Sequence, residues 1–163
     1  MPSINEISTW FVAEVKERTT ELDLRPYHLV RLCKIKEDRI ESHLRGDTFP
    51  GLFSLVLMAE HLECTVNDLL GFEEIEEIDI YERYLASDMF FTESQYATCL
   101  SDRVRRYLEE RNMTLAGLAK QTEFRLETVR HWFSKTRPHL PPTVKFLKIC
   151  EILECTPSEL LGY

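Results

Sequence analysis

The sequence is poor in the features that break a chain or send it to a membrane. Its 163 residues include only five glycines and seven prolines, and no segment is of low complexity. No apolar run approaches the roughly 18 residues that a membrane-spanning helix needs, and the N-terminus lacks a basic segment followed by an apolar one. With 44% hydrophobic residues, these absences predict a globular, cytoplasmic protein without a membrane segment.

Cysteine occurs, but not in the pattern of a disulfide framework or a metal site. The number is odd and no C-x-x-C pair is present. All five lie in apolar helical patterns: Cys33, Cys64, Cys99, Cys150 and Cys155. We therefore expect buried, reduced thiols, with a redox switch as the alternative.

Positive charge is scarce overall and unevenly distributed. The net charge of −8 argues against a protein that coats nucleic acid through bulk electrostatics, because such binding comes from cations that neutralise phosphates. Residues 1–72 carry −4, residues 73–98 carry −7 and residues 99–163 carry +3. The basic side chains are thus concentrated at the C-terminal end.

An internal repeat is the clearest positive feature. Residues 151–163, EILECTPSELLGY, match residues 60–72, EHLECTVNDLLGF, at eight of thirteen positions. The offset of 91 residues becomes 89 before a two-residue insertion near residues 137–139. The repeat predicts two units, 3–72 and 92–163, joined by an acidic connector at 73–91.

The apolar spacing within each unit is helical, and alternation typical of strands is absent. In the second unit this spacing predicts five core residues: Leu118, Val129, Trp132, Leu147 and Leu160. Five helices fit the second unit, at 93–111, 114–121, 125–135, 141–153 and 157–161. The expected helix starts are capping boxes at Ser3/Glu6 and Thr92/Gln95, a cap at Thr114, prolines at 141–142, and Thr156 before Pro157. An all-α protein follows.

The stretch 114–133, TLAGLAKQTEFRLETVRHWF, has the outline of a short helix, a four-residue turn and a second helix. Residues 27–46, YHLVRLCKIKEDRIESHLRG, have the same outline, ending in a glycine where a left-handed cap is expected. With the closing segments LECTVNDLL and LECTPSELL, both units resemble the lambda-repressor-like (Xre/Cro) helix-turn-helix family. The resemblance implies two tandem five-helix domains that bind double-stranded DNA.

Some positions depart from the family pattern. The turn glycine is replaced by Lys34 and Glu123, and Val30 and Cys33 replace the usual alanine and threonine. A non-glycine residue can occupy a left-handed position at a cost of roughly 1 kcal/mol, so these departures weaken the match without breaking it.

The resemblance places the DNA-facing side chains at the start and outer face of the third helix of each unit. In the second unit these are Arg125, Glu127, Thr128, Arg130 and His131, followed by Lys135 and Arg137. Arginine reads guanine edges, threonine contacts thymine methyl groups, and the flanking cations suit phosphates. The plainer interpretation of each set is a solvated helix face.

In the first unit the corresponding face is mixed in charge. The candidate DNA contacts are Lys36, Arg39, Ser42 and Arg45, and they share the face with Glu37, Asp38 and Glu41. Three carboxylates repel the phosphate backbone, so this unit is expected to read DNA weakly or to bind something else.

The connector, EEIEEIDIYERYLASDMFF, has an apolar stripe at helical spacing and is expected to be a helix that packs the units together. A homodimer interface through Met89, Phe90 and Phe91 is the sharper alternative.

The leading functional hypothesis is a DNA-binding regulator, a repressor or an accessory factor of a phage, plasmid or other mobile element, whose two units act as an intramolecular pseudo-dimer. The alternative is an antirepressor, inhibitor or DNA mimic that binds protein through its acidic faces. Neither a catalytic motif nor a metal-ligand spacing is present, so no enzyme activity and no cofactor are expected.

Overall fold

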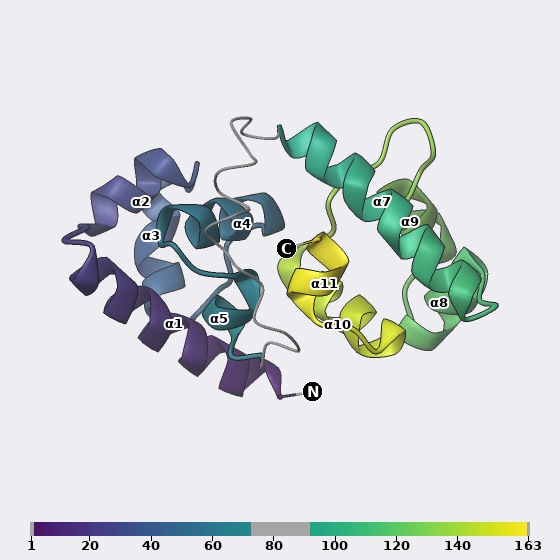
Figure 1. The fold of residues 1–163 in the computed structure, drawn as a ribbon, viewed down its shortest axis with the longest axis horizontal. Coiled ribbons are helices and arrows are strands. Elements are labelled where there is room, and N and C mark those ends of the chain that lie inside the picture. The colour runs from purple at the N-terminus through teal and green to yellow at the C-terminus, as the bar shows by residue number, and fades with distance from the viewer. Residues whose placement is uncertain (1, 73–91, 163) are drawn as a thin grey trace. The chain divides into compact units, whose positions relative to one another are not determined.

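The computed structural model describes residues 2–72 and 92–162, which form helices joined by turns and loops without a strand (Figure 1). The chain divides into two compact units, Met1–Ile80 and Tyr81–Tyr163. The expected connector helix at 73–91, with Met89, Phe90 and Phe91, lies outside the described residues.

The described part of the N-terminal unit holds five helices. They are α1 (Ile4–Glu21), α2 (Pro26–Leu32), α3 (Glu37–Leu44), α4 (Leu52–His61) and α5 (Val66–Leu70). The capping box expected at Ser3 and Glu6 is confirmed, and Thr65 caps α5 in the same way by accepting a hydrogen bond from the Asp68 amide.

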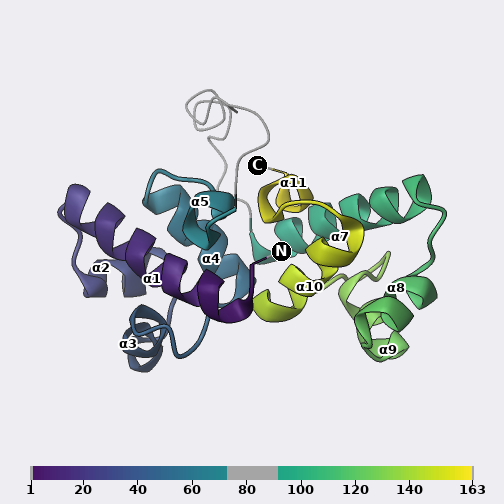
Figure 2. The same ribbon diagram turned by 90° about the horizontal axis from the view of Figure 1, so that it is seen from below.

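The core of this unit forms around α4, which is buried along almost its whole length. Helix α1 packs against α5 and α3 (Figures 1 and 2), with Phe11 and Val15 buried in the contact. The Trp10 indole donates a 2.7 Å hydrogen bond to the Asp68 carbonyl. Its ring covers Gly71, where φ is +70° and a Cβ would come within 2.6 Å of the ring. Only glycine suits that position.

The described part of the C-terminal unit also contains five helices. Its described residues form α7 (Glu93–Glu110), α8 (Leu115–Thr122), α9 (Leu126–Trp132), α10 (Thr143–Leu153) and α11 (Pro157–Leu161). The expected caps at Thr92, Thr114 and Thr156 are all confirmed, and Pro157 occupies the first turn of α11. Helix α7 packs on α11, and the guanidinium of Arg103 donates to the Leu161 carbonyl there.

The core positions expected from the sequence are confirmed. All are at most 6% exposed: Leu118, Val129, Trp132, Leu147 and Leu160. Phe133 and Phe146, which were not among the expected core residues, are fully buried beside them. The apolar helical spacing in the sequence therefore corresponds to the buried faces in the fold.

Two helix boundaries of the C-terminal unit differ by more than one residue from those expected. Helix α9 ends at Trp132 and not at 135, and α10 begins at Thr143 with Pro142 as its N-cap rather than at 141. The early end of α9 has a tertiary cause. The carbonyl of Trp132 accepts a 3.0 Å hydrogen bond from the His139 amide, and the carbonyl of Phe133 accepts one from Arg105 on α7. These donors satisfy the two carbonyl groups that the amides of a further helical turn would otherwise satisfy.

The cysteines are all free, but not all are buried. Cys33, Cys64 and Cys150 are buried as expected, and burial raises the pKa of Cys33 and of Cys64 to about 12. The expectation is wrong for Cys99, which lies on the solvent face of α7, and only half right for Cys155, which is partly exposed.

Candidate nucleic-acid interface

Helices α8 and α9 form the centre of the candidate site, and they pack directly against each other (Figure 2). Ala119, on α8, is 4% exposed, and Val129 on α9 is fully buried. A small side chain at position 119 allows two helices to cross this closely. The pair thereby holds the outer face of α9 toward solvent.

The turn between the two helices has a left-handed residue. Glu123 has φ +60°, and the next amide, that of Phe124, donates a 3.0 Å hydrogen bond to the Ala119 carbonyl. The Phe124 ring then meets Trp132 edge-on, with ring centroids 5.7 Å apart. One aromatic contact thus joins the turn to the end of α9 and fixes the angle between the helices.

Burial of Val129 and Trp132 determines which side chains of α9 face solvent. Arg125, Glu127, Arg130 and His131 are exposed, and Thr128 is half-buried. Across residues 2–72 and 92–162, the side chains of Arg125 and Arg130 have no hydrogen-bond or ion-pair partner. These guanidinium groups therefore keep all their donors for a ligand.

The loop after α9, the long connection between α9 and α10 in Figure 1, presents the remaining two candidates of this unit. The Ser134 hydroxyl accepts hydrogen bonds from the amides of Thr136 and Arg137, at 3.3 and 3.2 Å. His139 returns to α9, where its ring stacks on that of His131 at 4.1 Å between centroids. The side chains of Lys135 and Arg137 are exposed on this folded-back loop.

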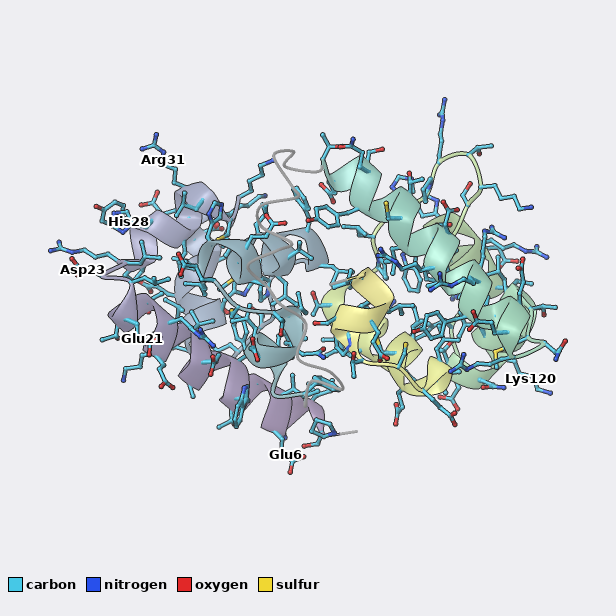
Figure 3. All side chains as sticks on the ribbon, in the orientation of Figure 1. Glu6, Glu21, Asp23, His28, Arg31 and Lys120 are labelled. Atoms are coloured by element: carbon cyan, nitrogen blue, oxygen red, sulfur yellow. The ribbon has the colours of Figure 1, made fainter. Side chains whose placement is uncertain are left out.

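Three lysines near the site were not among the expected contacts. Lys120, labelled in Figure 3, is exposed on α8. On α10, Lys145 Nζ lies 5.6 Å from the Phe124 ring centroid and 5.5 Å from that of Trp132, while Lys148 lies 3.8 Å from Glu123. The sequence gives only one indication of these contacts, which is that Lys145 and Lys148 lie one turn apart. Such a pair is also common on solvated helices.

The residues expected from the first unit fall on α3 and just beyond it. Lys36 is the N-cap of α3, and both Lys36 and Arg39 are exposed. Ser42 Oγ lies 3.1 Å from the Thr48 hydroxyl, and Arg45 pairs with Asp47 at 2.9 Å. Ser42 and Arg45 therefore have partners within their own unit, unlike the cations of α9.

Carboxylates dominate the rest of that face. Glu37, Asp38 and Glu41 are all exposed on α3. Glu41 lies 3.8 Å from Arg45, in a pair whose side chains are 84% and 62% exposed. Such a pair contributes little to stability and leaves the carboxylate accessible.

His43 is a buried polar side chain on the inner face of α3, 89 residues before Trp132. Its Nδ1 lies 2.9 Å from the Thr48 hydroxyl and 3.1 Å from the Thr48 carbonyl oxygen. Burial lowers the pKa of His43, and the nearby Arg39 adds to the effect, while the hydrogen bond to Thr48 opposes it.

The geometry of α8, the turn and α9 defines the C-terminal unit as a helix-turn-helix unit with a basic outer face. Comparison with known families agrees: residues 103–163 match the family model of the Cro/C1-type HTH DNA-binding domain. The C-terminal unit thus contains one Cro/C1-type helix-turn-helix domain. Comparisons with curated proteins and with solved structures found no significant match.

The part of the chain that the structure describes contains no group of three or more histidine, cysteine or acidic side chains placed to hold a metal ion. None of its helices is both long enough and apolar enough to cross a membrane.

Proposed function

We propose that this protein is a double-stranded DNA-binding transcription regulator that contacts DNA mainly through α9 and the following loop. The observation that carries the proposal is the pair of exposed, unpartnered arginines, Arg125 and Arg130, on a helix fixed by buried Val129 and Trp132. They lie in a unit that matches a DNA-binding family.

In this proposal α9 enters the major groove. Arg125 and Arg130 donate to guanine edges, and Thr128 contacts a thymine methyl group. Lys135 and Arg137, on the loop, neutralise phosphates and set the orientation of the helix without reading sequence. The exposed His131 completes the face, and Glu127 can accept from a cytosine amino group.

We also propose that residues 3–72 are a second copy of the module, so that the protein acts as a pseudo-dimer in a repressor or in an accessory factor of a mobile element. The support is the sequence repeat and the left-handed turn residues Lys34 and Glu123, whose φ angles are +52° and +60°. The carboxylates of α3 make the two copies unequal, with most DNA affinity in the C-terminal one.

The decisive experiment is titration of selected and random duplexes at two salt concentrations with three proteins: wild type, Arg125→Ala/Arg130→Ala and Lys36→Ala/Arg39→Ala. A lost bidentate contact costs about 1–3 kcal/mol, so the first variant should bind the selected site roughly 30-fold more weakly or worse. The second variant removes two positive charges from the corresponding helix of the other unit and should change affinity less.

Two outcomes would contradict the proposal. Absence of binding to any duplex at low salt removes the DNA function, and a protein-binding role with weak salt dependence then becomes the better account. A larger loss with Lys36→Ala/Arg39→Ala inverts the ranking of the two units.

A further inference from the structure

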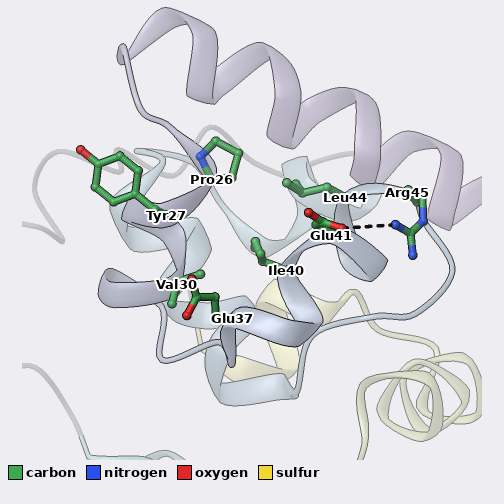
Figure 4. Close-up of a pocket in the computed structure, with 8 residues that line it drawn as sticks. All are labelled: Pro26, Tyr27, Val30, Glu37, Ile40, Glu41, Leu44 and Arg45. Atoms are coloured by element: carbon green, nitrogen blue, oxygen red, sulfur yellow. Dashed lines mark ion pairs between the residues drawn. The ribbon is translucent and has the colours of Figure 1, made fainter.

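A groove between α2 and α3 of the N-terminal unit is lined by both apolar and acidic side chains (Figure 4). It has a volume of about 520 Å³ and is open to solvent. Its lining comes from the start of α2 and the length of α3: Pro26, Tyr27, Val30, Glu37, Ile40, Glu41, Leu44 and Arg45. The volume lies within the range of about 300–1,000 Å³ that small-molecule pockets show.

The floor of the groove is apolar and one wall is aromatic. Ile40 is only 5% exposed and forms part of the floor, flanked by half-buried Val30 and Leu44. Tyr27 is 63% exposed, and its ring is tilted against that of His28 with centroids 4.0 Å apart. An exposed tyrosine beside an apolar depression is typical of an interface anchor, because its ring buries much apolar area with few rotatable bonds.

The rim on the α3 side is acidic. Glu37 and Glu41 are one turn apart and both line the groove, so their carboxylates lie at the same edge (Figure 4). Their only close cation in the groove is Arg45, which Asp47 already holds at 2.9 Å. The edge therefore carries net negative charge, which repels phosphates and attracts lysine or arginine.

The residues at the corresponding positions of the C-terminal unit differ in charge and in size. At the offset of 89 residues, Glu41 corresponds to Arg130 and Val30 to Ala119. At the position of the unpartnered Arg130, the N-terminal unit thus has a carboxylate at the edge of an apolar groove. This contrast argues against nucleic acid as the occupant of the groove.

We propose that the groove between α2 and α3 binds an apolar, helical segment of a partner protein whose flanks carry lysine or arginine. Apolar side chains one turn apart on that segment fill the space over Ile40 against Tyr27, and its basic flanks pair with Glu37 and Glu41. The site belongs to the N-terminal unit and uses none of α9 or the loop after it, which carry most of the proposed DNA affinity.

The test is selection of helical peptides from a displayed random library on the full-length chain, with Tyr27→Ala/Glu41→Lys as the counter-selection target. Enriched peptides are then synthesised and titrated by fluorescence anisotropy. We expect them to share apolar residues at i and i+4 with net positive charge. We expect affinity to fall at least tenfold with Tyr27→Ala and with Glu37→Lys/Glu41→Lys.

The matched control is Glu17→Lys/Glu63→Lys, which makes the same change of charge at two exposed positions of the same unit that do not line the groove. It should bind the peptides as the wild type does. Tyr27→Ala alters an exposed side chain only, so it keeps the test valid if the charge reversal on α3 weakens the fold.

Several results would overturn the inference. They are the absence of enrichment over the counter-selection target, enrichment of acidic peptides, or equal loss of binding with the control variant. Loss of peptide binding with Arg125→Ala/Arg130→Ala would move the site to the other unit. If the wild type is a dimer and Tyr27→Ala converts it to a monomer, the occupant of the groove is a second copy of the chain and not a partner protein. Loss of duplex binding in the DNA titration leaves the peptide result standing, so the two proposals fail separately.

Discussion

Helices α3 and α9 share a set of buried positions and differ in the charge they present to solvent. Ile40 and Val129, 89 residues apart in the chain, are both buried. One residue further along, α3 carries Glu41 and α9 carries Arg130, and both are exposed. The difference shows that the inner face of such a helix is constrained by packing, while its outer face is free to select a different partner.

The largest effect is expected from exchanging the two exposed charges. Arg130→Glu removes a base-edge donor and places a carboxylate against the phosphates, so duplex affinity should fall about 100-fold or more. Glu41→Arg in the other unit should leave it unchanged or raise it slightly. Electrophoretic mobility shift at low salt measures the duplex affinity of both variants. Equal changes in affinity would contradict the proposal that the C-terminal unit provides most of the DNA binding.

A second comparison concerns the packing under these faces. Ala119→Val gives the C-terminal unit the residue that the N-terminal unit has at that position, and overpacking of the close α8–α9 contact should cost about 1–3 kcal/mol. Val30→Ala, at a half-buried site, should cost less. Urea denaturation measures both, and an unchanged midpoint for Ala119→Val would show that α8 and α9 can move apart freely.

The turn residues sharpen the comparison at a smaller scale. Glu123→Gly relieves a left-handed conformation at φ +60° and loses only an exposed 3.8 Å ion pair, so it should stabilise its unit by about 1 kcal/mol. Lys34→Gly relieves similar strain but loses a contact of Lys34 with the Phe53 ring at 5.0 Å, worth about 0.5–1 kcal/mol. Its net effect should be near zero. Thermal unfolding of the two variants tests this, and the reverse order would refute it.

The smallest effect is a pH dependence confined to the N-terminal unit. Burial lowers the pKa of His43, so the unfolded chain takes up this proton at higher pH than the folded chain does. The contribution of the neutral His43 imidazole to the free energy of unfolding is present above about pH 6.5. It is lost as the pH falls through the folded pKa. An NMR titration should place the His43 midpoint below 6.5. A midpoint at or above that value, or a His43→Gln variant with unchanged pH dependence, would contradict the assignment.

Local signals in the sequence predicted most of the fold of the C-terminal unit. Thr92, Thr114 and Thr156 cap helices as expected, because a capping hydrogen bond needs only residues three positions apart. The sequence also predicted the exposure of Arg125 and Arg130, because burial of Val129 and Trp132 leaves them the opposite face.

The features that were missed depend on contacts between elements. The end of α9 at Trp132 requires donors from Arg105 and His139, and the position of Lys145 over two aromatic rings requires the turn and α10 to meet. Neither pairing has a fixed spacing in the chain. The groove of the N-terminal unit was missed for the same reason, since an apolar Val30 or Ile40 signals burial in the sequence but not an opening beside it.

By itself, then, the sequence determined the helices, their caps, their buried faces and the difference in charge between α3 and α9, because all of these follow from residue type and short-range spacing. Tertiary structure alone decided where α9 stops, how the loop with Lys135 and Arg137 folds back on His131, and that carboxylates line one edge of an apolar groove in the N-terminal unit. These depend on which side chains meet across tens of residues, and such meetings are set by packing of the whole unit.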